Sequence, residues 1–377
     1  MALWFSASAV VPQLREQWGI SSGAASWLTS SVQLGFVAGA LLSAAANLPD
    51  RLSTRGLIAG SALAAALANA AVAAFAEGLT VALPLRFLTG FFLAGVYAPG
   101  MKLMASWFRS GRGFAIGVMV GALTLGSGSP HLINGIGAFR WQTVLAVAST
   151  LALVGAALVL LVHDGPYGSP APPLDLGYAV RVFRDRPARL ANLGYFGHMW
   201  ELYAVWAWLP IYLAASIGGG RSTELWSFAA IGVVGLLGSV VAGLVADRFG
   251  RTATTIAAMT VSGSCSLAAA AVFGTAKPVV VGLALVWGFF VIADSAQFST
   301  AVSELCDPRY VGTALTVQTS IGFLLTIGSI RLVPALAGSW GWRWAFPLLA
   351  LGPALGVAAM WALRSDPAAA RMADGAR

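Results

Sequence analysis

The chain has 377 residues, of which 58% are hydrophobic and 10% are charged, and its formal net charge is +8. Soluble domains carry about 25% charged residues, so this composition excludes a water-soluble globular protein. The basic residues lie in short loops between apolar segments rather than in one basic domain, so we expect no nucleic-acid partner.

Apolar runs recur along the whole chain, and each run of about 20 such residues is long enough to cross a bilayer as a helix. The alternation of polar and apolar residues that a membrane β-barrel needs is missing. The sequence therefore predicts an all-α polytopic membrane protein with twelve transmembrane helices. The predicted spans are residues 1–14, 23–46, 56–76, 80–101, 113–134, 141–162, 190–214, 224–246, 252–274, 278–301, 311–335 and 341–363.

The first of these spans is short. Residues 1–14 give only about 21 Å of helix at 1.5 Å per residue, against a hydrocarbon core of roughly 30 Å. We expect that the first helix is truncated at its N-terminus; the alternative is a short, half-inserted helix.

A Pro- and Gly-rich break that ends in basic residues separates two sets of six spans. It predicts an N-terminal six-helix bundle at 1–163, a cytoplasmic linker at 164–189, a C-terminal six-helix bundle at 190–363 and a cytoplasmic tail at 364–377. The arginines and lysines of the loops favour one side by about fifteen to five, which places both termini in the cytoplasm by the positive-inside rule.

Three pairs of similar segments indicate that a six-helix unit occurs twice. Their offsets are 197, 203 and 199 residues, for Asp50 with Asp247, Arg140 with Arg343 and Gly113 with Gly312. The first pair marks the same charged loop, between the second and third helix of each half.

In the second half this loop reads GLVADRFGR. It resembles the G-x-x-x-D-R-x-G-R signature of the major facilitator superfamily, with Gly243, Asp247, Arg248, Gly250 and Arg251 in the motif positions. The first-half copy keeps Asp50, Arg51 and Arg55 but has Ala46 and Ser53 in place of the glycines.

The resemblance implies two six-helix bundles around a central cavity that opens alternately to each side. It also implies that the two charged loops act as conformational gates. The segments SASAVVPQL, GMKLMASWF and ADSAQFS further resemble bacterial permeases of the cyanate and nitrate/nitrite type.

A charge within a span costs at least about 2.5–3.5 kcal/mol on insertion scales, so each one needs a reason. Arg86 lies in the fourth span, with Gly90 and Tyr97 on the same helical face. We predict an anion or proton site there, with a structural ion pair or a snorkelling arginine as the alternative.

His198 and Glu201 are three residues apart, so they share a face of the seventh span. A low-dielectric environment favours the protonated form of a carboxyl group, so Glu201 is our first candidate for proton coupling. A structural hydrogen bond is the alternative for Glu201, and His198 is either its proton relay or a satisfied polar residue.

Other polar residues within spans are further candidates. Asp294 and Gln297 share a face that would line a cavity or the cytoplasmic gate, and a pair between Asp294 and an arginine is the alternative. His131 follows Pro130 at a predicted bend, and Arg331 lies near the outer end of its span, where snorkelling is easy.

We therefore expect a secondary transporter in the bacterial cytoplasmic membrane, driven by protons and active as a monomer. The two intramembrane arginines favour a small organic or inorganic anion as substrate; proton-driven efflux of hydrophobic compounds is the alternative. We expect neither an enzyme nor a cofactor or metal, because no catalytic or nucleotide-binding motif is visible.

Overall fold

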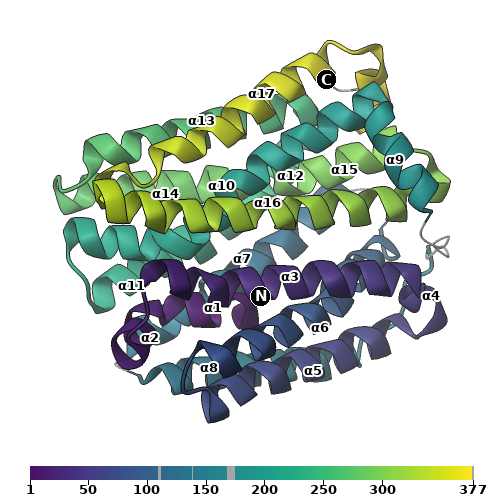
Figure 1. Ribbon diagram of the computed structural model, residues 1–377. Coiled ribbons are helices and arrows are strands. Elements are labelled where there is room, and N and C mark those ends of the chain that lie inside the picture. Colours follow the sequence, from purple (N-terminus) through teal and green to yellow (C-terminus); the bar gives the residue numbers. More distant parts are fainter. Residues whose placement is uncertain (109–111, 138, 168–174, 376–377) are drawn as a thin grey trace.

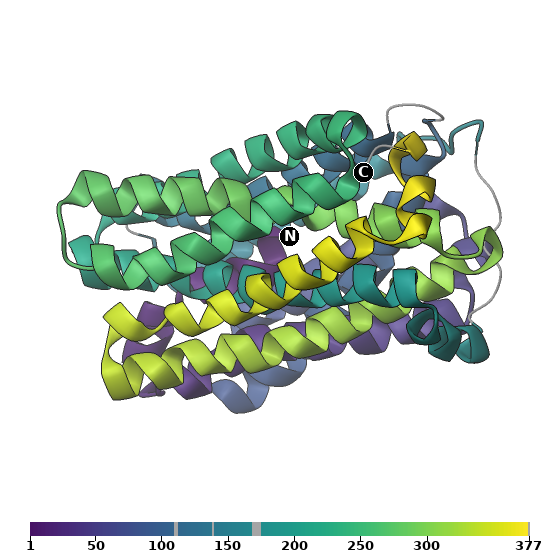
Figure 2. The same ribbon diagram turned by 90° about the horizontal axis from the view of Figure 1, so that it is seen from above.

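The computed structural model describes residues 1–108, 112–137, 139–167 and 175–375, and this part of the chain is helical, without β-strands. The helices form one elongated bundle in which the long elements run roughly side by side (Figures 1 and 2). The helices are α1 (Ala2–Ala9), α2 (Val11–Trp18), α3 (Ser22–Ala45), α4 (Leu48–Arg51), α5 (Thr54–Phe75), α6 (Leu79–Ala105), α7 (Arg112–Ile136), α8 (Trp141–Val159), α9 (Leu176–Arg184), α10 (Arg186–Ile217), α11 (Arg221–Phe228), α12 (Val234–Phe249), α13 (Arg251–Val272), α14 (Lys277–Ala293), α15 (Ser295–Leu305), α16 (Val311–Trp340) and α17 (Leu351–Arg364).

Ten helical segments of the described chain are long and apolar enough to cross a membrane, and they agree with ten of the predicted spans. The predicted spans 1–14 and 190–214 are not among the ten. The first is divided into α1 and α2 at Val10, two residues before a proline that cannot donate a helical hydrogen bond. The second lies within α10, which has 32 residues but carries His198 and Glu201 among its aromatic side chains.

Helices α1–α8 lie on one side of the bundle and α10–α17 on the other (Figure 1). We call these two sets the N-half and the C-half. The halves meet along two seams: α7 packs along α11 and α12, and α3 packs along α16. The domain boundaries themselves remain predictions.

Glycines allow the closest helix contacts inside each half. A Cβ atom on Gly90 of α6 would overlap the carbonyl oxygen of Val32 on α3, and one on Gly288 of α14 would overlap that of Ala230. Gly90 and Gly288 are 198 residues apart, which agrees with the offset of the repeated loop. The two halves therefore use small residues at corresponding positions for close packing.

The two copies of the charged loop turn in different ways. In the C-half, Gly250 joins α12 to α13 with φ at 94°, a conformation that favours glycine. In the N-half, Ser53 has φ at −62° and needs no glycine, because the positive φ falls instead on Asn47, at 51°. The shifted turn thus explains why the first copy can have Ser53 where the second has Gly250.

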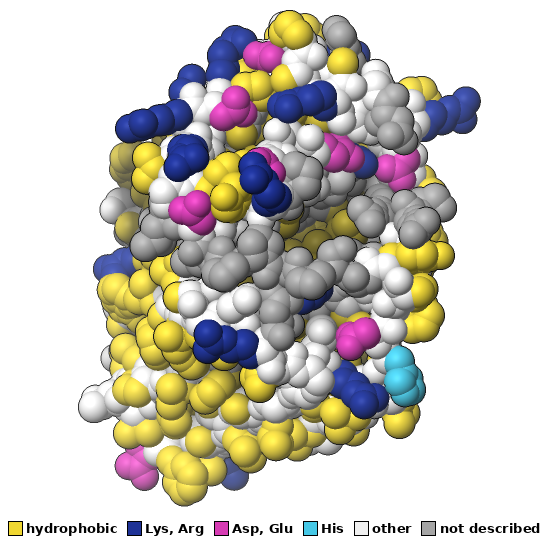
Figure 3. Space-filling model, turned by 90° about the vertical axis from the view of Figure 1, so that its right-hand side faces the viewer, with side chains coloured by type: hydrophobic (Ala, Val, Ile, Leu, Met, Phe, Trp, Pro, Cys, Tyr) yellow, Lys and Arg dark blue, Asp and Glu magenta, His cyan; other side chains and the backbone are white. Residues whose placement is uncertain are grey.

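Charged side chains gather at the end of the bundle where α4, α9 and the C-terminus lie (Figure 3). Helix α9 carries Arg181 and Arg184 in its last turn and packs against α16. Tyr178 of α9 stacks on Tyr310, with ring centroids 4.5 Å apart. This is the end that the positive-inside rule predicts to be cytoplasmic.

Candidate functional site

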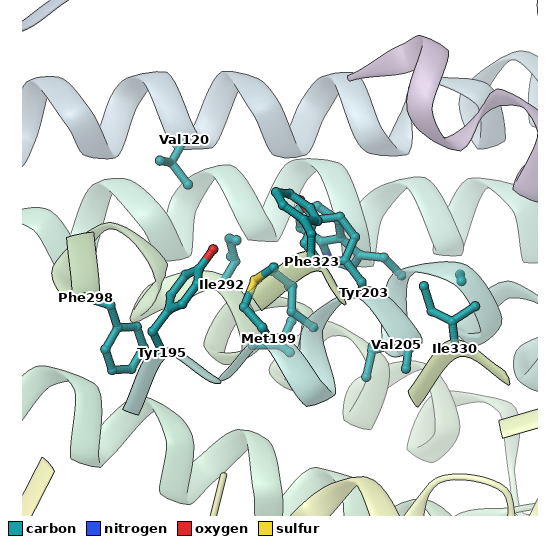
Figure 4. Close-up of a cluster of buried hydrophobic side chains, with 14 of the residues drawn as sticks. Val120, Tyr195, Met199, Tyr203, Val205, Ile292, Phe298, Phe323 and Ile330 are labelled. Carbon is teal, nitrogen blue, oxygen red and sulfur yellow. The ribbon is translucent and has the colours of Figure 1, made fainter. Parts of the chain in front are cut away.

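A cavity of about 30 Å³ lies between the two halves near the middle of the bundle. Its wall is mainly aromatic and hydroxyl-bearing, and Figure 4 shows Tyr195, Met199 and Tyr203 on the C-half side, with Val120 of α7 opposite them. Among the described residues, no charged side chain lines the cavity. Its lining includes Tyr97, Val120, Leu123, Tyr195, Met199, Leu202, Tyr203, Trp206, Ile292, Ser295, Ser299, Thr319 and Phe323.

Aromatic rings from both halves meet beside this cavity. Phe323 of α16 lies 4.7 Å from Phe36 of α3 and 5.1 Å from Tyr203 of α10, measured between ring centroids. Trp4 of α1 is 5.0 Å from Phe323. We call Trp4, Phe36, Tyr203 and Phe323 the aromatic cluster. It packs across the boundary between the halves, so a movement that parts α3 from α16 must separate Phe36 from Phe323.

Arg86 is fully buried, but it is not among the residues that line the cavity. Its guanidinium donates to the carbonyl oxygens of Leu3 (2.7 Å), Leu28 (3.2 Å) and Trp4, and to Asn69 Oδ1 at 2.8 Å. All of these acceptors are neutral groups of the N-half. Arg86 thus ties α1, α3 and α5 to α6, and its role as an anion or proton site remains a prediction.

Glu201 is 1% exposed and its carboxylate faces α13 and α14. It accepts hydrogen bonds from Ser262 Oγ at 2.8 Å, Ser266 Oγ at 2.7 Å and Trp287 Nε1 at 2.9 Å. Within the described chain no arginine or lysine forms an ion pair with it. Burying a charged carboxylate without a cation is costly, so the group is suited to carry a proton while it is enclosed.

His198 and Asp294 form a buried pair. Nδ1 of His198 lies 2.8 Å from Oδ1 of Asp294, and the two side chains are 1% and 2% exposed. The sequence placed His198 beside Glu201 and offered an arginine for Asp294, whereas the structure joins the histidine to the aspartate. Asp294 lies at the junction of α14 and α15, next to the cavity residue Ser295.

Arg251 of the charged loop is the centre of a buried network at the end of the bundle that is predicted to be cytoplasmic. Its guanidinium lies 3.0 Å from Glu304 Oε1 and 3.0 Å from Asp247 Oδ1, and donates to Gln297 Oε1 at 2.9 Å. All four residues belong to the C-half, so the contacts seen here do not bridge the halves. Gln297 therefore belongs to the charged-loop network, and it does not line the cavity.

The remaining charged-loop residues have other surroundings. Arg248 is exposed, and its guanidinium lies 5.3 Å from the ring centroid of Phe249. Arg51 and Arg55 are exposed, Gly243 is buried, and the side chain of Asp50 lies outside the part that the structure describes.

At the opposite end, which is predicted to face outward, charged side chains do connect the two halves. His131 Nδ1 of α7 lies 2.7 Å from Glu224 Oε2 of α11. Arg221 donates to the carbonyl oxygens of Gly135 (3.1 Å) and Ile136 (2.6 Å) at the end of α7. We call His131, Glu224 and Arg221 the outer latch.

Arg331 joins the halves at the other seam, where its guanidinium lies 4.3 Å from the ring centroid of Trp27 on α3. It is exposed and, like Arg86, it does not line the cavity. Of the predicted substrate residues, only Tyr97 is a lining residue.

Sequence reasoning missed most of the cavity wall and also Glu304 and Glu224. Tyr195, Tyr203, Ser299 and Thr319 look like ordinary residues of a membrane helix, and no local pattern distinguishes them. Glu304 closely follows a predicted span, among the charged residues of a loop that is predicted to be cytoplasmic. That position was the one signal in the sequence that could have pointed to it. No group of three or more metal-binding side chains occurs among the described residues.

A bundle of membrane-length helices in two halves around a small central cavity has the architecture of a secondary transporter. The chain belongs to the Major Facilitator Superfamily, whose profile matches residues 1–330 and again residues 191–376.

Several curated relatives cover much of the chain. It is similar to the glycerol-3-phosphate transporter of Bacillus subtilis, with 22% identity over 375 residues, covering 90% of this chain and 83% of that protein. It is 27% identical over 368 residues to the uncharacterized MFS-type transporter Rv2994 of Mycobacterium tuberculosis, covering 91% and 78% of the two chains. A shorter match of 31% over 157 residues, 41% of this chain and 34% of the relative, joins it to the 4-hydroxybenzoate transporter PcaK of Pseudomonas putida. The likeness to cyanate and nitrate/nitrite permeases remains a prediction.

Proposed function

We propose that the protein is a proton-coupled secondary transporter of uncharged aromatic or similarly apolar organic solutes. The composition of the central cavity carries this proposal. Its rings and aliphatic side chains offer stacking and apolar contact, and the hydroxyls of Ser295, Ser299 and Thr319 offer hydrogen bonds. An uncharged solute can bind there without leaving a charge unpaired.

The cavity supports this solute class better than the small anion that the two arginines suggested. Arg86 is engaged by neutral acceptors inside the N-half, and Arg331 stacks on Trp27 at the outer seam. An anion in the cavity would therefore meet no arginine, lysine or histidine side chain among the described lining residues. The alternative that the sequence offered, transport of hydrophobic compounds, is the one that we carry forward.

Glu201 is the proton carrier in this proposal. Its three neutral donors can hold the carboxylate, and none of them supplies a compensating positive charge. A proton therefore makes it easier to enclose the group, and exposure to water on the other side allows the proton to leave. Leu202, the next residue of α10, lines the cavity, so movement of this helix would connect the two events.

The membrane arrangement follows from the same helices. In this proposal α1 with α2, and α10, cross the bilayer together with the ten apolar segments, which gives twelve spans. The cytoplasmic membrane of a bacterium holds the protein as a monomer, with both termini and the linker at the charged end (Figure 3).

Flux in proteoliposomes tests the solute class with a matched pair of compounds. 4-Hydroxybenzamide and 4-hydroxybenzoate have nearly the same shape but differ in charge at neutral pH, and glycerol 3-phosphate adds a second anion. Each is followed with a pH gradient imposed in either direction, and protein-free liposomes give the passive background. We expect gradient-driven movement of the amide and none of the two anions.

Glu201→Gln tests the carrier, with Glu77→Gln as the control because Glu77 is exposed. We expect Glu201→Gln to weaken gradient-driven accumulation while exchange of the solute across the membrane persists. Accumulation of the anions without the amide would overturn the solute class and return Arg86 to consideration as a binding group. Unchanged accumulation in Glu201→Gln would remove Glu201 from the coupling mechanism.

A further inference from the structure

Two separate acidic groups are buried in the C-half. Glu201 is held by Ser262, Ser266 and Trp287, and Asp294 is held by His198. We propose that the pair of His198 and Asp294 is a second proton-binding site, so that two protons move with each solute molecule. This inference rests on the proton-coupled transport proposed above.

The net charge of the enclosed groups gives the number of protons. With one added proton, the His198–Asp294 pair is neutral overall, as an imidazolium beside a carboxylate or as two uncharged groups. Without that proton the pair carries a buried negative charge, and with a second proton it carries a positive one. Either charge is costly away from water, so the enclosed pair holds one proton.

The other titratable groups around Glu201 and the His198–Asp294 pair support a total of two protons. Glu201 lies on α10, and Asp294 lies at the junction of α14 and α15, two helices that pack against α10. Tyr195 of α10 faces His198, and Cys265 of α13 precedes Ser266, which donates to Glu201. Arg251 donates to Gln297, one turn along α15 from Asp294. Among the described residues, no arginine or lysine pairs with either carboxylate, so two protons neutralise the two sites together.

The pair lies directly behind the cavity wall, which links it to solute binding. The ring of Tyr195 lies 6.2 Å from that of His198, measured between centroids, and Tyr195 also lines the cavity. The ring of Phe298, which Figure 4 shows beside Tyr195, lies 5.6 Å from the imidazole of His198, measured between centroids. When the cavity opens and Tyr195 moves with α10, water reaches the pair and its proton can exchange.

The number of protons is measured as the solute gradient at which net flux stops. Proteoliposomes carry a pH difference of one unit, and valinomycin with equal potassium on both sides holds the membrane potential at zero. One unit of pH shifts an equilibrium tenfold for each proton that moves, so two protons balance a solute ratio of about 100-fold and one proton about 10-fold. We expect about 100-fold for the unaltered protein with 4-hydroxybenzamide.

Three variants assign the protons to sites. Asp294→Asn and Glu201→Gln each leave one site, so each should balance at about 10-fold, and the double variant should only equilibrate the solute. His198→Gln keeps the Asp294 carboxyl, which can hold the proton itself, so its ratio should stay at about 100-fold. Glu77→Gln is the control and should match the unaltered protein.

Even if a variant fails to fold, the unaltered protein alone decides how many protons move with each solute molecule. A balance at about 10-fold means one proton, which overturns the second site and leaves the proposed function intact. Equilibration without any accumulation overturns the proposed function itself. A ratio of about 100-fold that persists in Asp294→Asn overturns the assignment to this pair.

Discussion

The outer latch offers the sharpest prediction about alternating access. Glu224 and Arg221 of α11 hold the end of α7 through His131 and through the carbonyl oxygens of Gly135 and Ile136. These contacts cross from one half to the other, so they exist only while that end of the cavity is closed. The perturbation is Glu224→Gln, which keeps the shape of the side chain and removes its charge.

The free energy that this change removes follows from the geometry of the His131–Glu224 pair. His131 is 3% exposed and Glu224 is 26% exposed, and their atoms are 2.7 Å apart, so the contact is a partly screened, charge-assisted hydrogen bond. Bonds of this kind contribute about 1–2 kcal/mol after allowance for the exposed partner. Losing that amount raises the population of the outward-open state about 5- to 30-fold, because the contact stabilises only the closed state.

Cysteine labelling measures this population. Thr319, which lines the cavity, is replaced by Cys in a background where Cys265 and Cys306 are Ala, and a membrane-impermeant maleimide is added from outside. We expect labelling about 5- to 30-fold faster in Glu224→Gln, and no change in Glu16→Gln, an exposed carboxylate on α2. Equal rates in Glu224→Gln and Glu16→Gln, or faster labelling only from the cytoplasmic side, would refute the reasoning.

Two further predictions concern the packing of the N-half and use thermal unfolding in detergent. Arg86→Met should destabilise the fold by about 3 kcal/mol, because it removes the charged donor that Asn69 and three carbonyl oxygens share. Normal stability with a selective loss of anion transport would contradict this structural role. Gly90→Ala should cost about 1–3 kcal/mol, because its methyl group would overlap the carbonyl oxygen of Val32. In Gly60→Ala, where a Cβ would meet nothing within 4 Å, we expect an unchanged midpoint, and equal midpoints in the two variants would count against the packing argument.

The positions of the helices could be predicted because hydropathy and turn residues are local properties of the chain. The predicted span 311–335 begins with α16, and the predicted span 252–274 differs from α13 by one residue at its start and two at its end. The division between α1 and α2 could not be predicted with the same rules, because a proline near the start of a helix is usually tolerated.

The partners of the charged residues could not be predicted, because they come from distant parts of the chain. Arg251 and Glu304 are 53 residues apart, and His131 and Glu224 are 93 apart. The rule that charges within spans mark function made Glu201 and Asp294 candidates, but it does not say which way a side chain points. Arg86 faces the interior of its own half, whereas uncharged tyrosines, serines and a threonine form the cavity wall.

The two ends of the bundle are closed by different kinds of contact, which bears on how the cycle proceeds. At the outer end, the latch and the stacking of Arg331 on Trp27 join the halves through charged groups. At the end predicted to be cytoplasmic, Arg251 is satisfied within the C-half by Asp247, Gln297 and Glu304. Opening the outer end must therefore break specific contacts between the halves, whereas opening the cytoplasmic end leaves this network intact. We therefore expect the charged loop of the C-half to stabilise its own half as a rigid unit in this conformation, and the outer latch to set the balance between the two openings.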